Sequence, residues 1–501
     1  MNKKINRLLK GALAFTVAFS TLAVTTSTSR KVSAVEQEES YTQYVDPFVC
    51  TDVDYGQLFP GSVVPNGLVK LSPDTYPHNT LDHAGYDYSK LQIQGFSHTR
   101  IEGVGGQGAG GDVLVTPTYV EYSQRPQAQT RAMNYTKEDE SAKPGYYSVE
   151  LTPKTGKDND VKDSPEIGKI KAEMTTDQRT GFHRYTFPEA GSVNIITDLN
   201  YTYHGTDIRN AYVDVLEQSD TTTAIGGRFS GRNVSGNGKY TMYFYMETSK
   251  PANSVKTWND TTLSDKTSQK GNDIGTIMNF DVKENEEIQL KVSISPISVK
   301  QAKIDMHNEI SDWDFDAAAS RADKAWNDVL SKVRVESSKV SDPTGELKQL
   351  FYTHLYHMFM TPVNATSTSG TFRGTDGKIH EANDYIHYDS WTLWDDYRKY
   401  PMIGLIQPDT YKDMVKSIAD ALDYGIVTWS HDKQPVPNVR TEHAVALLAD
   451  GVAKGFTDID NLEEAYEEAK EIVNEVITSE VEEIGYVPNR VDRTIEYGYD
   501  D

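Results

Sequence analysis

Apolar and polar positions follow a different period in each half of the chain. From about Tyr44 to Pro296, apolar residues alternate with polar ones in short runs separated by turn residues, as in Ser235-Gly-Asn-Gly238. A period of two predicts strands with one buried face, and many short strands predict a β-sandwich. Thr136 to Asp163 is rich in charged residues and predicts a polar loop or surface strands. The clearest predicted strands are residues 181–187, 192–198, 240–246 and 289–294.

After Ile297 the apolar residues recur three and four positions apart, which predicts amphipathic helices. In one predicted helix, at about 347–360, they are Leu347, Leu350, Phe351, Leu355, Met358 and Phe359. Further helices are predicted at about 317–333, 391–406, 411–424, 441–454 and 461–483. A chain of 501 residues exceeds the usual size of one domain. We therefore expect a sandwich domain at 44–297, a helical linker at 298–340 and a helical domain at 341–501.

Residues 1–34 have the pattern of a secretory signal peptide. Four basic residues between Lys3 and Lys10 precede an apolar run from about Gly11 to Val24, and Val32-Ser-Ala34 supplies small residues for cleavage. The run is short for a stable membrane span, and no later segment has the length to cross a bilayer. We expect the mature protein to be secreted or at the cell surface, without a membrane span.

The chain is strongly acidic. Its formal net charge is −24, and removal of residues 1–34, which contain six Lys or Arg and no acid, takes it to −30. Such a surface repels polyanions, so nucleic acid is not an expected partner. Neutral glycans are indifferent to it, and solubility alone is a sufficient reason for the excess of acids.

Several short motifs match known signatures without their structural context. Gly103-Val-Gly-Gly-Gln-Gly108 fits the dinucleotide fingerprint but lacks the apolar strand before it and the helix after it. His354 and His357 stand three apart on a predicted helix, and core histidines are favoured over a zinc pair, which needs a further ligand. The single cysteine, Cys50, excludes an intrachain disulfide and is expected to be a small packing residue.

One block carries candidate chemistry. Asp389-Ser-Trp-Thr-Leu-Trp-Asp-Asp-Tyr-Arg-Lys-Tyr-Pro401 places two tryptophans, three aspartates and an arginine in an otherwise helical apolar pattern. An indole covers the apolar face of a pyranose, carboxylates accept hydrogen bonds from vicinal hydroxyls, and an arginine holds the carboxylates in place. The block indicates sugar binding. The alternative is a buried tryptophan beside a surface ion pair.

Ordered blocks near the start of the expected mature chain strengthen the sugar-binding interpretation. They are Tyr44-Val-Asp-Pro-Phe48, Phe59-Pro-Gly-Ser-Val-Val-Pro-Asn-Gly67, Leu71-Ser-Pro-Asp-Thr75, Ala84-Gly-Tyr-Asp-Tyr88, Gly95-Phe-Ser-His-Thr99 and Gly111-Asp-Val-Leu-Val-Thr-Pro117. Together with the tryptophan block they resemble glycoside hydrolase family 92, secreted calcium-dependent exo-α-mannosidases. The resemblance runs from about Tyr44 to Asp501. It implies an N-terminal β-sandwich followed by an (α/α)6 barrel, which we expect to be incomplete because the chain stops inside the catalytic domain.

The resemblance also implies roles for residues of the tryptophan block. In the family this block belongs to the subsite that holds the terminal mannose. Asp395 is therefore expected to bind sugar hydroxyls, Trp394 to stack on or shape the sugar, and Arg398 to support them. The alternative is that Trp394 is only a core residue.

Five further residues are candidates by resemblance. His98, Arg100 and Glu102 belong to the segment of the glycine-rich loop and are expected to contact a second sugar, although Arg100 replaces the second histidine of the family's Ser-His-Thr-His pattern. His443, at a predicted helix start, either points into the pocket or serves as a cap or core residue. Glu496 matches the family's Thr-Leu-Glu-Tyr-Ala-Tyr-Asp-Asp block and is a pocket candidate, but not the expected general acid.

The resemblance implies an inverting mechanism. Such an enzyme needs a general acid and a general base separated by roughly 6.5–9.5 Å. In the family, calcium binds hydroxyls of the terminal mannose, and the acid, the base and most metal ligands are expected in segments after Asp501, so no metal ligand is assigned in this chain. The expected substrates are N-glycans or mannans with terminal mannose, α-1,2-linked by preference. The alternative is a catalytically incomplete glycan-binding fragment.

Overall fold

The computed structural model describes residues 39–52, 58–78, 83–100, 110–203, 209–232, 239–391, 393–425 and 443–471, without the side chains of residues 232, 239, 394 and 395. Contacts divide the chain into Met1–Glu39 and Ser40–Asp501. The predicted signal peptide, residues 1–34, lies outside the described residues. Over the described ranges, no helix has the length and apolar character that crossing a membrane requires.

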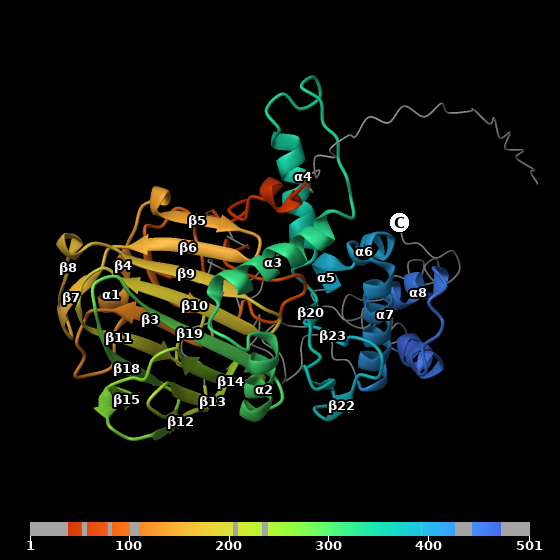
Figure 1. The fold of residues 1–501 in the computed structure, drawn as a ribbon. Coiled ribbons are helices and arrows are strands. Elements are labelled where there is room, and N and C mark those ends of the chain that lie inside the picture. Colours follow the sequence, from red (N-terminus) through yellow and green to blue (C-terminus); the bar gives the residue numbers. More distant parts are fainter. Residues whose placement is uncertain are drawn as a thin grey trace, which may run out of the picture. The chain divides into compact units, whose positions relative to one another are not determined.

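Two antiparallel sheets form a β-sandwich, with strands coloured orange to green in Figure 1. Among the described residues, the larger sheet has the order β17-β12-β13-β14-β19-β10-β9-β6-β5. Its strands are β5 (Glu140–Lys143), β6 (Tyr146–Leu151), β9 (Ile170–Thr176), β10 (Thr180–Phe187), β12 (Ala211–Gln218), β13 (Thr223–Arg232), β14 (Lys239–Thr248), β17 (Ser268–Gly271) and β19 (Glu286–Ser295). The predicted strands at 181–187, 240–246 and 289–294 are confirmed as β10, β14 and β19.

The second sheet has the order β1-β2-β3-β11-β18-β15-β16, with β4 paired to β2. Its strands are β1 (Ser72–Thr75), β2 (Gln92–Ser97), β3 (Leu114–Thr118), β4 (Met133–Asn134), β11 (Gly191–Asp198), β15 (Ser254–Asn259), β16 (Thr262–Ser264) and β18 (Ile274–Val282). The predicted strand at 192–198 is confirmed as β11. A separate hairpin joins β7 (Lys154–Lys157) to β8 (Asp160–Asp163), and a short helix α1 (Ala128–Arg131) precedes β4.

The core of the sandwich lies between the two sheets. Successive side chains of a strand point to opposite faces, so residues two apart share one face. In β19, Ile288, Leu290 and Val292 are fully buried and belong to one apolar cluster with Ile195 of β11 and Met278 of β18. The period of two in the sequence therefore corresponds to the buried inner face.

Two helices cover the larger sheet, and Figure 1 shows them in green across its strands. Helix α2 (Val299–Glu309) contacts β14 and β19, and α3 (Phe315–Leu330) contacts β9 and β10. Each helix begins at a side-chain cap. The Ser298 side chain accepts a hydrogen bond from the Gln301 N–H at 3.0 Å, and the Asp314 side chain accepts one from the Ala317 N–H at 2.9 Å. These caps satisfy backbone N–H groups that a helix start leaves unpaired.

A mainly helical segment follows. Its helices are α4 (Glu346–Met358), α5 (Leu393–Asp396), α6 (Tyr400–Ile406), α7 (Pro408–Asp423), α8 (Ala444–Ala453) and a helix at 462–471. Short strand pairs join β20 (Val363–Asn364) to β23 (Tyr388–Asp389) and β21 (Thr371–Arg373) to β22 (Ile379–Glu381). The predicted class, a β-sandwich followed by a helical domain, is confirmed.

The prediction of one helix at 391–406 is wrong. The structure has two short helices, α5 and α6, with a turn between them. Pro401 lies in the first turn of α6, where its missing N–H leaves no bond unmade. Inside a continuous helix it would remove the hydrogen bond to the carbonyl four residues earlier and clash with it. The apolar spacing continues across this break, so the spacing alone does not reveal the break.

Two predictions about single side chains are also corrected. Cys50 is exposed at a turn with φ of 65°, and is not a packing residue. His354 is exposed on α4, and is not a core histidine. On the same helix, Leu347 is 62% exposed whereas Leu355 is buried, so the apolar face is only partly covered.

Buried polar contacts join the sandwich to the helical segment. Arg179, between β9 and β10, lies 2.7 Å from Glu309 of α2 and donates to the Asn364 amide oxygen at 3.0 Å. Asn66 donates to the Pro362 carbonyl at 2.7 Å. These contacts fix the start of β20, and through its pairing with β23 they position the segment that leads into α5.

Candidate functional site

The tryptophan block begins at β23, where Asp389 pairs with Val363 of β20. Trp391 is 1% exposed, and its ring lies 5.4 Å from that of Tyr400 at an interplanar angle of 80°. An edge-to-face pair of this kind is typical of a core. For Trp391 the alternative interpretation, a buried packing residue, is therefore the correct one.

Asp389 is a buried carboxyl at the start of the block. One of its oxygens accepts a hydrogen bond from the Ser390 N–H at 2.7 Å, and the other has no hydrogen-bond partner among the described residues. Burial raises the pKa of Asp389 to about 8, because the charged form loses its hydration. At neutral pH this carboxyl is mostly protonated.

A polar network holds the turn between α5 and α6. The Lys399 ammonium lies 2.8 Å from the Asp396 carboxylate and donates to the Thr361 hydroxyl at 2.8 Å. The Thr361 hydroxyl in turn donates to Asp396 at 3.1 Å. The network ties α5 to the segment after α4 and so limits how α5 can move.

The structure brings two of the predicted site residues to one ring. Arg398 is exposed and lies 4.5 Å above the ring of Tyr397, whose centroid is 4.8 Å from that of His443. His443 stands at the start of α8 without a side-chain cap bond, so the cap interpretation is not observed. Trp394 and Asp395 have their backbones in α5, but their side chains lie outside the described set.

His98 occupies the interior of the sandwich. Its Nδ1 lies 2.7 Å from the Val113 carbonyl and its Nε2 lies 2.9 Å from Nε2 of His183. The side chain is fully buried. This position does not match the predicted contact with a second sugar, because both ring nitrogens are already engaged inside the protein.

Arg100 is likewise buried. Its guanidinium donates to the carbonyls of Lys70 at 3.0 Å, Ala84 at 3.1 Å and Ser72 at 2.9 Å. An arginine with several backbone acceptors organises the surrounding loops, and the predicted sugar contact does not fit it either. Glu102 and Glu496, the remaining predicted site residues, lie outside the described residues.

A calcium site needs several oxygen ligands, often from carboxylates. Within the described ranges, no group of three or more His, Cys, Asp or Glu residues is placed to hold a metal ion. The calcium requirement stays a prediction.

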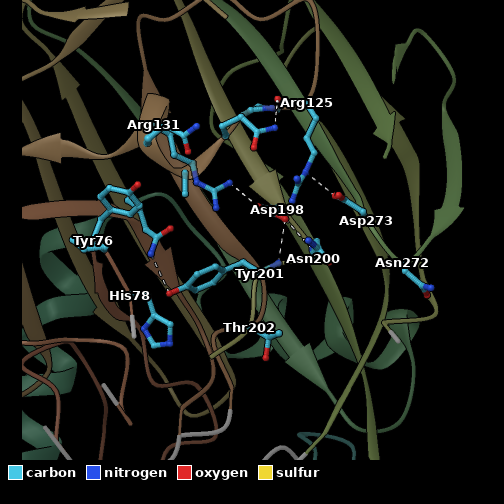
Figure 2. Close-up of a pocket in the computed structure, with 16 residues that line it drawn as sticks. Tyr76, His78, Arg125, Arg131, Asp198, Asn200, Tyr201, Thr202, Asn272 and Asp273 are labelled. Carbon is cyan, nitrogen blue, oxygen red and sulfur yellow. Dashed lines mark hydrogen bonds and ion pairs between the residues drawn. The ribbon is translucent and has the colours of Figure 1, made fainter. Parts of the chain in front are cut away.

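Sequence reasoning missed a cavity of about 610 Å³ on the sandwich, shown in Figure 2. The residues around it that carry rings or charges include Tyr76, His78, Arg125, Arg131, Asp198 and Tyr201. Tyr76 and His78 follow β1, Arg125 and Arg131 precede β4, and Asp198 and Tyr201 lie at and after the end of β11. The sheet therefore brings together segments that are far apart in the chain. No local motif links them, and the sequence contains no signal that would have grouped them.

The chain combines a β-sandwich with a helical segment. Aromatic and carboxyl groups lie both at β23–α5 and in the sandwich cavity. This is the arrangement of a two-domain carbohydrate-active protein. The family model described as the glycosyl hydrolase family 92 N-terminal domain matches residues 44–295. The model of the family 92 catalytic domain matches residues 301–501. The chain belongs to glycoside hydrolase family 92.

Solved structures support this assignment. The family 92 glycosyl hydrolase ccman5 is 43% identical, with a TM-score of 0.80, over 85% of this chain and 56% of that one. A family 92 α-mannosidase from Bacteroides thetaiotaomicron, solved with mannoimidazole, is 28% identical with a TM-score of 0.73, over 86% of this chain and 55% of that one.

A protein of Arthroderma benhamiae described as an uncharacterized secreted glycosidase is 21% identical, over 93% of this chain and 60% of its own length. The chain thus spans little more than half the length of these relatives.

Proposed function

We propose that the protein is a secreted exo-acting α-mannosidase that removes terminal mannose, α-1,2-linked by preference, from N-glycans or mannans. The observation that carries this proposal is the match of both family 92 domain models, at 44–295 and 301–501. The relative from Bacteroides thetaiotaomicron, which is named an α-mannosidase and was solved with mannoimidazole, supports the choice of mannose. The secreted glycosidase of Arthroderma benhamiae supports the location.

The proposed mechanism is inverting hydrolysis. A general acid protonates the leaving oxygen while a general base activates a water molecule on the opposite face of the sugar. Calcium would supply a positive charge that binds hydroxyls of the terminal mannose. Neither the acid nor the base is assigned to a described residue.

Within this mechanism, residues of α5 bind the terminal sugar. Asp395 accepts hydrogen bonds from vicinal hydroxyls, Trp394 covers the apolar face of the ring, and Arg398 supports the carboxylate. Support for a rigid α5 comes from the Lys399, Asp396 and Thr361 network. A site that is held by such contacts loses less conformational entropy when it binds a ligand.

A second candidate function is glycan binding without hydrolysis. It is favoured by the residues of the tryptophan block, which supply sugar-binding groups, whereas no described residue is assigned as the acid or the base.

The test is release of free mannose from α-1,2-linked mannobiose by the purified protein, with calcium and then with a chelator. The proposal expects release that the chelator abolishes and that calcium restores. Asp395→Asn should lower kcat/KM at least about tenfold, because a charged hydrogen bond to the sugar becomes a neutral one. Asp220→Asn, at an exposed turn between β12 and β13, is the matched control. No release by protein that is demonstrably folded would leave glycan binding as the function.

A further inference from the structure

The cavity in the sandwich is built around a buried ion pair. Arg131 Nη1 lies 2.6 Å from the Asp198 carboxylate, and both residues are almost completely buried. The other oxygen of Asp198 accepts hydrogen bonds from the N–H groups of Asn200 at 2.8 Å and Tyr201 at 3.2 Å. Figure 2 shows Asp198 joined by dashed lines to Arg131 and to Tyr201. The pair is therefore held rigidly by the loop that follows β11.

One donor of this ion pair is left without a partner. Nε of Arg131 is buried and makes no hydrogen bond within the part of the chain that the structure describes. Arg131 itself is 3% exposed and lines the cavity. A buried donor without a partner costs free energy, because it has lost its hydrogen bonds to water. An acceptor oxygen on a ligand in the cavity would remove that cost.

The charges of the cavity are balanced. Arg125 forms an ion pair with Asp273 at 2.7 Å, as Arg131 does with Asp198. Each arginine of the cavity thus has a carboxylate partner. Burial alone would raise the pKa of Asp198, but the two arginines hold it below its ordinary value, so this carboxyl is ionised at neutral pH. Phosphate or another anion would meet arginines that are already neutralised, and an apolar ligand would leave buried donors unpaired. A neutral polar ligand fits best.

Rings complete the cavity. The rings of His78 and Tyr201 are 6.3 Å apart at an angle of 73°, and Tyr76 also lines the cavity. The Tyr201 hydroxyl accepts a hydrogen bond from Gln94 at 3.3 Å, which leaves its own proton available for a ligand. Burial raises the pKa of Tyr201 well above its ordinary value, so the hydroxyl keeps that proton. Aromatic faces beside planar polar groups suit a pyranose, which has apolar C–H faces and a rim of hydroxyls.

We propose that this cavity is a second, non-catalytic glycan-binding site that takes one neutral hexopyranose unit. Its volume of about 610 Å³ lies within the range of small-molecule sites. All the described residues that line it come from the sandwich, and none of these comes from the block Asp389 to Pro401. The cavity would hold an outer sugar of a longer glycan. That the sugar is mannose rests on the proposed function.

The test is titration calorimetry with a linear α-mannotriose. The protein carries Asp395→Asn, which weakens binding at the tryptophan block. Arg131→Lys keeps a positive charge beside Asp198 but removes Nε, and should weaken binding roughly tenfold, as expected for one lost hydrogen bond to a charged donor. Arg184→Lys is the matched control, since Arg184 pairs with Glu173 at 2.8 Å outside the cavity. It should leave the affinity unchanged.

A milder variant keeps the test valid if Arg131→Lys does not fold. Tyr201→Phe retains the ring and removes only the hydroxyl, and should also weaken binding several-fold. The proposal is overturned if both folded variants bind mannotriose as tightly as their parent, or if inorganic phosphate displaces the sugar. Mannose release is measured separately, with Asp395 intact. Binding that depends on Arg131, without mannose release by the protein that retains Asp395, would support the cavity and reject the hydrolase. Mannose release by that protein, with no effect of either variant on binding, would do the reverse.

Discussion

His98 and His183 form a chain of neutral hydrogen bonds inside the sandwich. The Val113 carbonyl can only accept, so His98 Nδ1 carries the proton and its Nε2 is an acceptor. The bond of 2.9 Å between the two Nε2 atoms then requires His183 Nε2 to donate. This leaves His183 Nδ1 as the acceptor for the Tyr185 hydroxyl at 2.9 Å. One tautomer of each ring satisfies the whole chain.

The same burial makes the pair sensitive to acid. Burial lowers the pKa of His98 to about 3 and that of His183 well below its ordinary value. In the unfolded chain each ring returns to a pKa of about 6.5. Between these values the unfolded state binds more protons than the folded state. The free energy of unfolding therefore falls as the pH drops below about 6.5.

We predict that His183→Gln flattens this dependence. Between about pH 6.5 and pH 5, the free energy of unfolding should fall less steeply for this variant than for the parent. The two slopes should differ by about 1.4 kcal/mol per pH unit, because one histidine no longer titrates. Urea unfolding at both pH values measures the slopes. His354→Gln changes an exposed histidine and should keep the parental slope. Equal slopes for all three proteins would show that the buried pair does not titrate on unfolding.

Site residues could be predicted from the sequence where they lie close together along the chain. The tryptophan block could be recognised because its residues are contiguous. Its two tryptophans, however, look alike in sequence, and only the edge-to-face contact with Tyr400 shows that Trp391 is core. Arg131 and Asp198 meet because the order of the strands brings them together, which no local pattern encodes.

At the scale of elements, the connection between the sandwich and the helices includes one buried ion pair. Arg179 follows β9, and Glu309 ends α2. Burial raises the pKa of Glu309 to about 7, although Arg179 beside it acts in the opposite direction. The same guanidinium also donates to the Thr366 carbonyl after β20. Loss of Arg179 would unpair groups in α2, in β20 and in the segment after β20 at once.

We predict that Arg179→Ala lowers the free energy of unfolding by about 3 kcal/mol or more, as for other buried pairs that lose one partner. Glu309→Gln should cost less, because its amide oxygen still accepts a hydrogen bond from Arg179. Denaturant unfolding measures both. Lys324→Ala is the control, since Lys324 and Asp328 form an exposed pair whose removal costs at most about 1 kcal/mol. If Arg179→Ala cost no more than this control, the junction would not depend on the pair.

Elements were predictable where one period dominated. The strands β10, β11, β14 and β19 follow from alternation, because their inner faces are buried in a continuous core. The segment 136–163 was predicted as a polar loop or surface strands, and its composition concealed that Tyr147, Val149 and Leu151 of β6 are fully buried. The break at Pro401 was missed because apolar spacing measures which face is buried, and not whether the backbone hydrogen bonds continue.

At the scale of the whole molecule, the excess of acids sets the electrostatics. The chain carries 74 Asp and Glu against 50 Lys and Arg. On the helix at 462–471, Glu463, Glu464 and Glu467 are all exposed. Like charges three and four positions apart on a helix destabilise it by about 0.2–0.5 kcal/mol a pair. Folding brings such charges closer together, so net repulsion acts against the folded state.

We predict that sodium chloride stabilises the protein at neutral pH. Raising the salt from about 0.01 M to about 0.1 M shortens the screening length from about 30 Å to about 10 Å and should raise Tm by about 2 °C or more. Glu464→Gln should raise Tm at low salt and lose that advantage at high salt, because screening then removes the same repulsion. Sucrose, which is uncharged, is the control for a general solute effect, and the Glu464→Gln difference should persist in it. A Tm that is independent of salt would mean that the exposed acids are already balanced by nearby lysines, as Glu467 is by Lys470 at 2.7 Å.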